Sequence, residues 1–139
     1  MQEIDISNHR FGWDHSGKTI QDMVGQTFNR VYQCTNSDGN DALCFENSEG
    51  IFVFSHQQDC CENVYIEDIT GYLDDLIGSP ILKASAESQD DPKASESATW
   101  TFYKFATIKG WVDVRFYGSS NGYYSEGVSL NYVSKKDIQ

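Results

Sequence analysis

Apolar and polar residues alternate along much of this chain, a pattern typical of strands in a sheet that has one solvated face. In one segment Val112, Val114 and Phe116 alternate with Asp113 and Arg115. Polar, glycine-containing turns separate such runs, and the Asn-Gly pair at 121–122 is a strong hairpin signal. The pattern predicts strands at 27–35, 42–46, 51–55, 64–69, 81–86, 99–108, 111–117 and 123–133.

Two similar segments, 22–28 and 75–81, lie 53 positions apart. In each, a short helical pattern ends at a glycine suited to a left-handed cap, and an apolar strand follows. We therefore predict short helices at 19–24 and 70–77. The expected fold class is α+β: a mostly antiparallel β-sheet with two short helices, arranged as two helix-then-meander halves. Residues 1–139 form a single domain, with an N-terminal arm at 1–16 and a solvated loop at 85–97.

The charge of the chain is unevenly distributed. The net charge is −11, and the segment from Asp38 to Glu96 holds fourteen acids and two bases, Lys83 and Lys93. The remainder holds seven acids and eight bases, so all the excess negative charge lies in the middle segment. Direct binding to nucleic acid is not expected there, because such binding needs Lys and Arg to displace counterions. Solubility alone is the simpler explanation of the acids, and a docking face is the more specific one.

The chain lacks the signals of membrane proteins and of export. No stretch approaches the ~20 apolar residues of a membrane helix, and the acidic start of the chain has no apolar run typical of a signal peptide. We therefore expect a cytoplasm as the location and four reduced thiols at Cys34, Cys44, Cys60 and Cys61.

One short motif matches a phosphate-binding loop. Gly12–Thr19 fits G-x-x-x-x-G-K-[ST], whose backbone amides cradle phosphates at the start of a helix. Asp14 would place a carboxylate near the phosphates, and the segment before the motif is short and polar. We interpret it instead as a turn into a helix capped by Ser16 or Thr19. No enzyme motif is present elsewhere, so neither catalysis nor a cofactor is expected.

The segment His56–Glu62 combines His, Cys and carboxylate side chains, which are the usual zinc ligands. It has no C-x-x-C pair, and adjacent cysteines on a strand point to opposite faces. No metal site is expected. The alternative is a small-ligand or metal-binding site centred on this segment, with His56 and Cys60 as ligands.

Two runs, SHQQDCCENVYIEDITGYLDDLIGSPIL at 55–82 and GSSNGYYSEGVSLNYV at 118–133, resemble a domain family of unknown function in small phage and bacterial proteins. The resemblance implies no activity, cofactor or catalytic residue. It implies a small phage-type protein acting in a bacterial cytoplasm, where such proteins often block host factors.

Together these observations predict a small acidic binding protein that docks on a basic surface of a host protein and inhibits it, with nucleic-acid mimicry as one form. Neither a membrane nor nucleic acid is expected as a partner, and the sequence leaves the oligomeric state open. Acids beside a strand-to-helix junction and two tyrosines beside a polar turn supply the candidate contacts. These are Glu62, Glu67, Asp68, Asp74, Asp75, Tyr123 and Tyr124.

Overall fold

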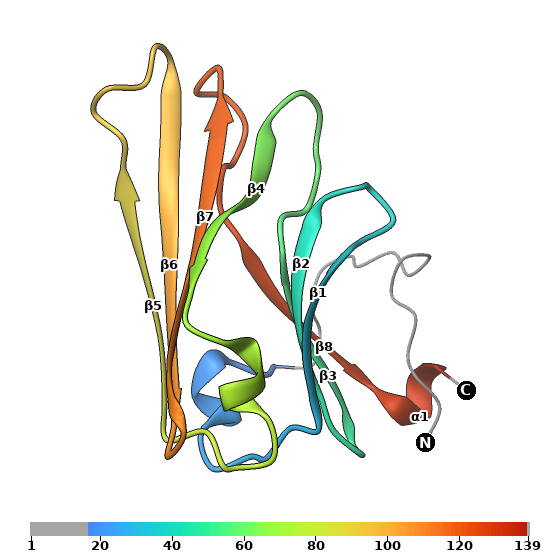
Figure 1. Cartoon of the computed structure of the whole chain (residues 1–139). Helices are drawn as coiled ribbons and strands as arrows, with labels where there is room; N and C mark the ends of the chain where they lie inside the picture. Colours follow the sequence, from blue (N-terminus) through green and yellow to red (C-terminus); the bar gives the residue numbers. More distant parts are fainter. Residues whose placement is uncertain (1–16, 139) are drawn as a thin grey trace.

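Two four-stranded antiparallel sheets form the protein (Figure 1). The computed structural model describes residues 17–138. One sheet has the strand order β1-β2-β3-β8 and the other β4-β7-β6-β5. The strands are β1 (Arg30–Thr35), β2 (Asp41–Glu46), β3 (Gly50–Ser55), β4 (Asn63–Thr70), β5 (Lys83–Asp90), β6 (Ser97–Thr107), β7 (Gly110–Ser120) and β8 (Ser129–Ser134).

The predicted α+β class is wrong, and the fold is all-β. The two predicted helices are single 3₁₀ turns, η1 (Ile20–Met23) and η2 (Leu73–Leu76). The described residues otherwise contain only the four-residue helix α1 (Lys135–Ile138). Both 3₁₀ turns are followed directly by extended residues, Val24 and Ile77. Helices of one turn gain too few hydrogen bonds to persist alone, so packing against the sheets holds them.

The two similar segments noted in the sequence occupy equivalent places. η1 and η2 begin 53 residues apart, as do β1 and β5. The segments also pair with each other: the N–H of Gly25 donates to the carbonyl of Ile81, and the N–H of Gly78 donates to that of Phe28. Gly78 is 53 residues after Gly25, and Ile81 is 53 residues after Phe28, so each hydrogen bond is the counterpart of the other. The two segments are therefore related by a local pseudo-two-fold axis.

The connectivity joins the two halves closely. After η1, strands β1, β2 and β3 form a meander in one sheet, and β4 then crosses to the other. After η2, strands β5, β6 and β7 form a meander in the second sheet, and β8 returns to the first. Each half therefore lends one strand to the sheet of the other half, and neither sheet is complete without both.

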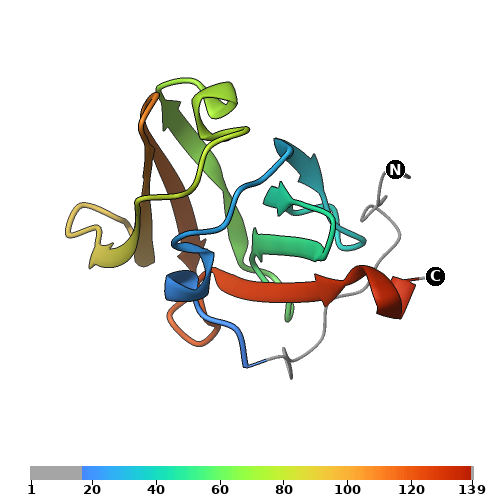
Figure 2. The same cartoon turned by 90° about the horizontal axis from the view of Figure 1, so that it is seen from below.

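The two sheets face each other (Figure 2), and the core that lies between them is rich in phenylalanine. Phe45 on β2 is fully buried, and its ring centroid lies 4.7 Å from that of Phe105 on β6 and 5.4 Å from that of Phe28. Phe54 on β3 lies 4.7 Å from Tyr103 on β6. Aromatic pairs at these separations contribute beyond their buried area, so they hold the sheets face to face.

Strand β5 corrects another expectation. The segment 85–97 was expected to be a solvated loop, but β5 continues to Asp90 and pairs with β6 throughout. Only a short turn near 91–96 separates β5 from β6. The predicted N-terminal arm at 1–16 lies outside the described residues. Within 17–138, no helix is long and apolar enough to cross a membrane.

Candidate partner-binding site

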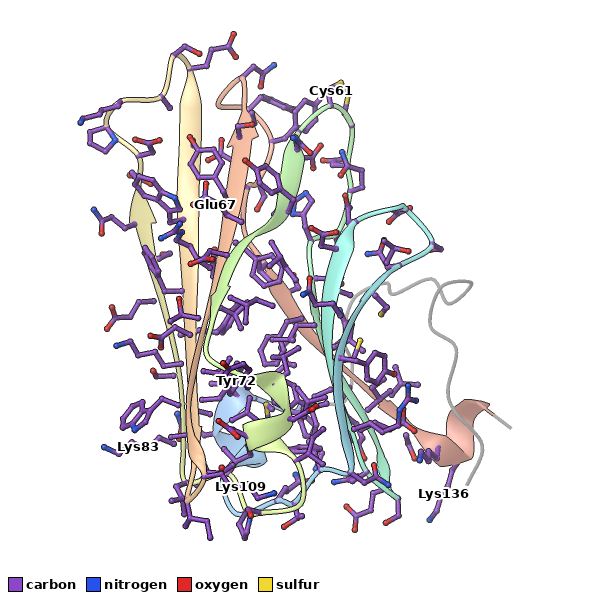
Figure 3. The ribbon with its side chains drawn as sticks, viewed as in Figure 1. Cys61, Glu67, Tyr72, Lys83, Lys109 and Lys136 are labelled. Atoms are coloured by element: carbon purple, nitrogen blue, oxygen red, sulfur yellow. A yellow bond between two sulfur atoms is a disulfide. The ribbon has the colours of Figure 1, made fainter. Side chains whose placement is uncertain are left out.

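Four loops meet at one end of the sandwich, the upper end in Figure 1. They are the segments 36–40, 56–62, 91–96 and 121–127, and we call this the upper end. Their six acids are Asp38, Asp59, Glu62, Asp91, Glu96 and Glu126, whereas Lys93 is their one lysine or arginine. Cys61 also lies there, whereas Lys83, Lys109 and Lys136 lie toward the opposite end (Figure 3). The fold therefore concentrates negative charge at the upper end.

A buried hydrogen-bond network shapes the 56–62 loop. His56 is 2% exposed and Glu62 4% exposed. The Nε2 atom of His56 lies 2.8 Å from Oε2 of Glu62, and Nδ1 lies 2.7 Å from the carbonyl oxygen of Gly127. Both ring nitrogens of His56 therefore face oxygen atoms and are engaged in hydrogen bonds. The network ties the β3–β4 loop to the β7–β8 loop.

Glu62 remains ionised in this buried position. Burial opposes the ionised form and would raise its pKa, but the N–H of Cys60 and the ring of His56 donate to it and lower the pKa to about 2. The N–H of Asp59 donates to Oε2 at 3.0 Å, and that of Cys60 donates to Oε1 at 2.8 Å. These hydrogen-bond donors replace most of the hydration that the Glu62 carboxylate loses on burial.

The predicted alternative ligands, His56 and Cys60, are both engaged elsewhere. His56 uses both ring nitrogens in the network, and Cys60 forms a disulfide with Cys61. Within the part of the chain that the structure describes, no three His, Cys, Asp or Glu side chains are arranged to hold a metal ion. A cavity of about 590 Å³ does lie beside this loop, with walls that include Gln57, Gln58 and Ser125.

The expectation of four free thiols differs from the structure at two positions. Cys60 and Cys61 lie in a bend between β3 and β4, not on a strand, so their side chains do not point to opposite faces. Cys34 and Cys44 are thiols rather than disulfide partners, with their sulfur atoms 3.3 Å apart. The hydrogen bond between Cys34 and Cys44, together with burial, raises the pKa of the Cys44 thiol, so Cys44 stays protonated.

A polar cleft of about 470 Å³ opens between the 91–96 turn and the end of β7. Hydroxyl and amide side chains predominate in its walls, and no lysine, arginine or histidine is among them. The lining residues are Cys61, Asn63, Ala94, Ser95, Glu96, Ser97, Tyr117, Ser119, Ser120, Asn121 and Tyr124. Its volume is in the range of ligand-binding clefts.

A buried carboxylate, Glu126, lies against the lining residues of this cleft. It is 8% exposed, and Thr99 donates to its Oε1 at 2.8 Å while Ser120 donates to its Oε2. Burial opposes the ionised form, but hydrogen bonds from Ser120, Ser97 and Thr99 outweigh it and lower the pKa of Glu126. Negative charge is therefore held beside the cleft and is stabilised by hydrogen bonds from hydroxyl groups.

Tyr117 forms part of the cleft wall and of an aromatic row on the outer face of the second sheet. Its hydroxyl donates to Oδ2 of Asp91 at 2.7 Å. This hydrogen bond raises the pKa of Tyr117 to about 12 and lowers that of Asp91. The ring of Tyr117 lies 5.5 Å from that of Trp100 on β6 and 6.1 Å from that of Tyr65 on β4. The row places flat apolar area next to the polar cleft.

The predicted contact acids do not form one face. Glu62 is buried at the upper end, so it is not available for direct contact with a partner. Asp74 and Asp75 lie on η2 at the opposite end. Asp68 is exposed and lies on β4, between Glu62 at the upper end and the two η2 acids at the opposite end.

Glu67 is also on β4, but it is already engaged. It lies at a β-bulge, and Arg115 and Trp100 donate to its Oε1 at 2.6 and 3.2 Å. Its charge is therefore partly compensated.

The two predicted tyrosines both lie at the upper end. Tyr124 lines the cleft, whereas Tyr123 is 84% exposed and packs its ring 5.0 Å from that of Tyr124. Glu126 and the cleft serines were not predicted as functional residues. Ser97, Thr99 and Ser120 approach Glu126 only through the pairing of β6 with β7, which no local pattern shows.

The phosphate-loop motif Gly12–Thr19 lies mostly outside the described residues. Within them, Thr19 is the N-cap residue of η1, and its backbone N–H donates to Oδ2 of Asp22 at 2.6 Å. This is the reciprocal half of a capping box, which agrees with the interpretation of Thr19 as a helix cap. The absence of nucleotide binding stays a prediction.

The chain belongs to the domain of unknown function family DUF7448, which matches residues 16–130. The resemblance to a family of unknown function is thereby confirmed. No curated protein and no solved structure matches the chain.

Proposed function

We propose that this protein is a binding protein whose upper end docks on a basic surface of a partner protein. One observation carries the proposal: the four loops of the upper end hold six acids against the single Lys93. Opposite charges across an interface accelerate encounter and select partners. Asp38, Asp59 and Glu96 are exposed there, and none of the ion pairs between residues 17 and 138 involves them, so they are the first contacts to test.

Two further features support a docking role for this end. The cleft supplies a concave surface, and the tyrosines at 123–124 supply apolar area with hydrogen-bonding tips, as is common in recognition surfaces. The network of His56 and Glu62 anchors one loop to another, so the surface is ordered before a partner arrives. A preorganised surface loses less entropy on binding.

The partner that we propose is a bacterial host protein. The resemblance to phage and bacterial proteins makes a bacterial host protein the first class to test, with inhibition as the consequence of docking. If the partner normally binds nucleic acid, the acidic upper end competes with DNA or RNA for the same basic surface.

Affinity capture from bacterial lysate with three baits tests the proposal. The first bait is the full chain. The second carries Asp38→Lys, Asp59→Lys and Glu96→Lys at the upper end. The third, a matched control, carries Asp68→Lys, Asp74→Lys and Glu87→Lys, which reverse the same number of exposed acids away from that end. Circular dichroism establishes that all three are folded.

The expected result is a protein retained by the first and third baits, lost from the second, and released as salt rises. Retention by the second bait but not the third would place the contact among the exposed acids of β4, η2 and β5, and would overturn the proposal for the upper end. Equal retention by all three baits would refute a role for exposed acids altogether.

A further inference from the structure

Three side chains in the walls of the cleft at the upper end already direct their hydroxyl protons to carboxylates. A hydroxyl group has one proton, and Ser97 and Ser120 direct theirs to Glu126, while Tyr117 directs its proton to Asp91. The N–H of Gly122 uses one lone pair of Ser120 at 2.9 Å. The oxygens of Ser97 and Tyr117 therefore meet an incoming group mainly as acceptors.

The charges around the cleft have the same preference. The ionised Glu126 lies beside the cleft, and Glu96 is part of the cleft wall. Asp91 accepts the hydrogen bond of Tyr117, another wall residue. No cationic side chain lines the cleft. Lys93 lies on the same turn as Asp91, and its charge and backbone N–H help to lower the pKa of Asp91. A ligand that brings hydrogen-bond donors and positive charge fits these acceptors and carboxylates, whereas an anion would be repelled by the charges of Glu96 and Glu126.

Two tyrosine rings line the cleft and favour a flat cation. Tyr117 and Tyr124 both contribute to the walls. A guanidinium group is planar, carries five donors and stacks on aromatic faces, whereas an ammonium group is a compact and more strongly hydrated charge. The cleft is thus suited to guanidinium rather than to ammonium.

We infer that the cleft receives an arginine side chain of the partner protein, which serves as the central anchor of the interface. The inference rests on the proposed function and adds the kind of residue that the cleft recognises. Buried arginines are frequent among the few residues that dominate the affinity of protein interfaces.

The probe is a capped arginine, Nα-acetyl-arginine methylamide, titrated into the ¹⁵N-labelled full chain. The matched ligands are the same derivatives of citrulline, which has nearly the same shape without the charge, and of lysine. We expect saturable shifts at the amides of Ser97, Asn121 and Tyr124, with citrulline binding at least about tenfold and lysine several-fold more weakly.

Three variants locate the site. Glu126→Gln removes the charge beside the cleft, and Glu96→Gln removes a charge from its wall without touching a buried group. Each should weaken capped arginine about three- to tenfold, and Tyr124→Ala should do so by a similar factor. Tyr72→Ala is the control, because Tyr72 is 77% exposed and lies next to η2, away from the upper end (Figure 3). It should leave the affinity unchanged.

The outcomes separate this inference from the proposed function. Equal binding of arginine and citrulline, shifts away from the cleft, or no saturable binding would overturn the arginine assignment. If the capture experiment still depends on the upper-end acids, the docking proposal survives that result. If arginine binds in the cleft but no captured protein depends on those acids, the inference about guanidinium holds and docking through the upper end fails.

Discussion

The clearest quantitative consequence of the structure concerns Glu62. Its pKa falls from 4.5 to about 2 in the folded protein. Since each pKa unit corresponds to about 1.4 kcal/mol, the ionised carboxylate contributes about 3 kcal/mol to stability at neutral pH. The Glu62→Gln substitution keeps the size but loses the charge that His56 and two backbone N–H groups bind. We expect it to lower the free energy of unfolding by about 2–3 kcal/mol at pH 7.

The sign of the pH dependence follows from the direction of the shift. The folded pKa lies below the unfolded one, so the contribution is complete above about pH 4.5 and is lost as the pH falls toward 2. At pH 3 the unfolded carboxyl is mostly protonated, while the folded one is still mostly ionised. The difference between the wild-type protein and the Glu62→Gln variant should therefore shrink by about 2 kcal/mol, to less than half its value at pH 7.

Urea unfolding followed by tryptophan fluorescence at pH 7 and pH 3 measures both quantities. Asp59→Asn is the control, because Asp59 is exposed and only its backbone N–H reaches Glu62, so its effect should stay within about 0.5 kcal/mol. A Glu62→Gln effect below about 0.5 kcal/mol, or one that is the same at both pH values, would refute the account of the network.

Three further predictions test other parts of the structure. Phe45→Ala should lower the free energy of unfolding by about 3–5 kcal/mol in urea unfolding, because Phe45 is fully buried against Phe28 and Phe105. Gly78→Ala should cost about 1–2 kcal/mol in the same assay, since Gly78 has φ of 79°, and Gly127→Ala, without a positive φ, should cost less than about 0.5 kcal/mol. Asp91→Asn should lower the pKa of Tyr117 from about 12 toward 10, as followed by NMR titration of its ring, because the hydrogen bond to Asp91 is the main cause of the elevation. An unchanged pKa would contradict that hydrogen bond.

The strands were largely predictable, and the exceptions have physical causes. The alternation in 111–117 identified β7, because one face of that sheet is buried and the other is solvated. The continuation of β5 through 85–90 was missed because Ser, Asp and Gln are uncommon in strands. Pairing with the aromatic strand β6 holds that segment extended in spite of its composition.

The predicted helices failed because their patterns were only one turn long. Glycines at 25 and 78 with positive φ were correctly placed as turn positions, but each follows a 3₁₀ turn rather than an α-helix. Periodicity over so few residues does not distinguish the two.

The site was less predictable than the fold. Glu62 was expected at the surface because charged residues are rarely buried. It is buried because donors from its own loop and His56 replace water. Glu126 has hydroxyl partners from two other strands, so its role depends on strand register and not on any local motif. Tyr124 was a candidate contact from its turn, and the structure adds that it lines a cleft.

The central claim is that the upper end of the sandwich docks on a basic protein surface. Once a captured partner has been purified, calorimetry at about 50 and about 300 mM salt tests this claim most directly, with the wild-type chain and the Asp38→Lys, Asp59→Lys, Glu96→Lys variant. The account predicts that salt weakens binding of the wild-type chain at least about tenfold, and that the reversal abolishes binding at low salt. A dissociation constant that changes with neither salt nor the reversal would contradict it.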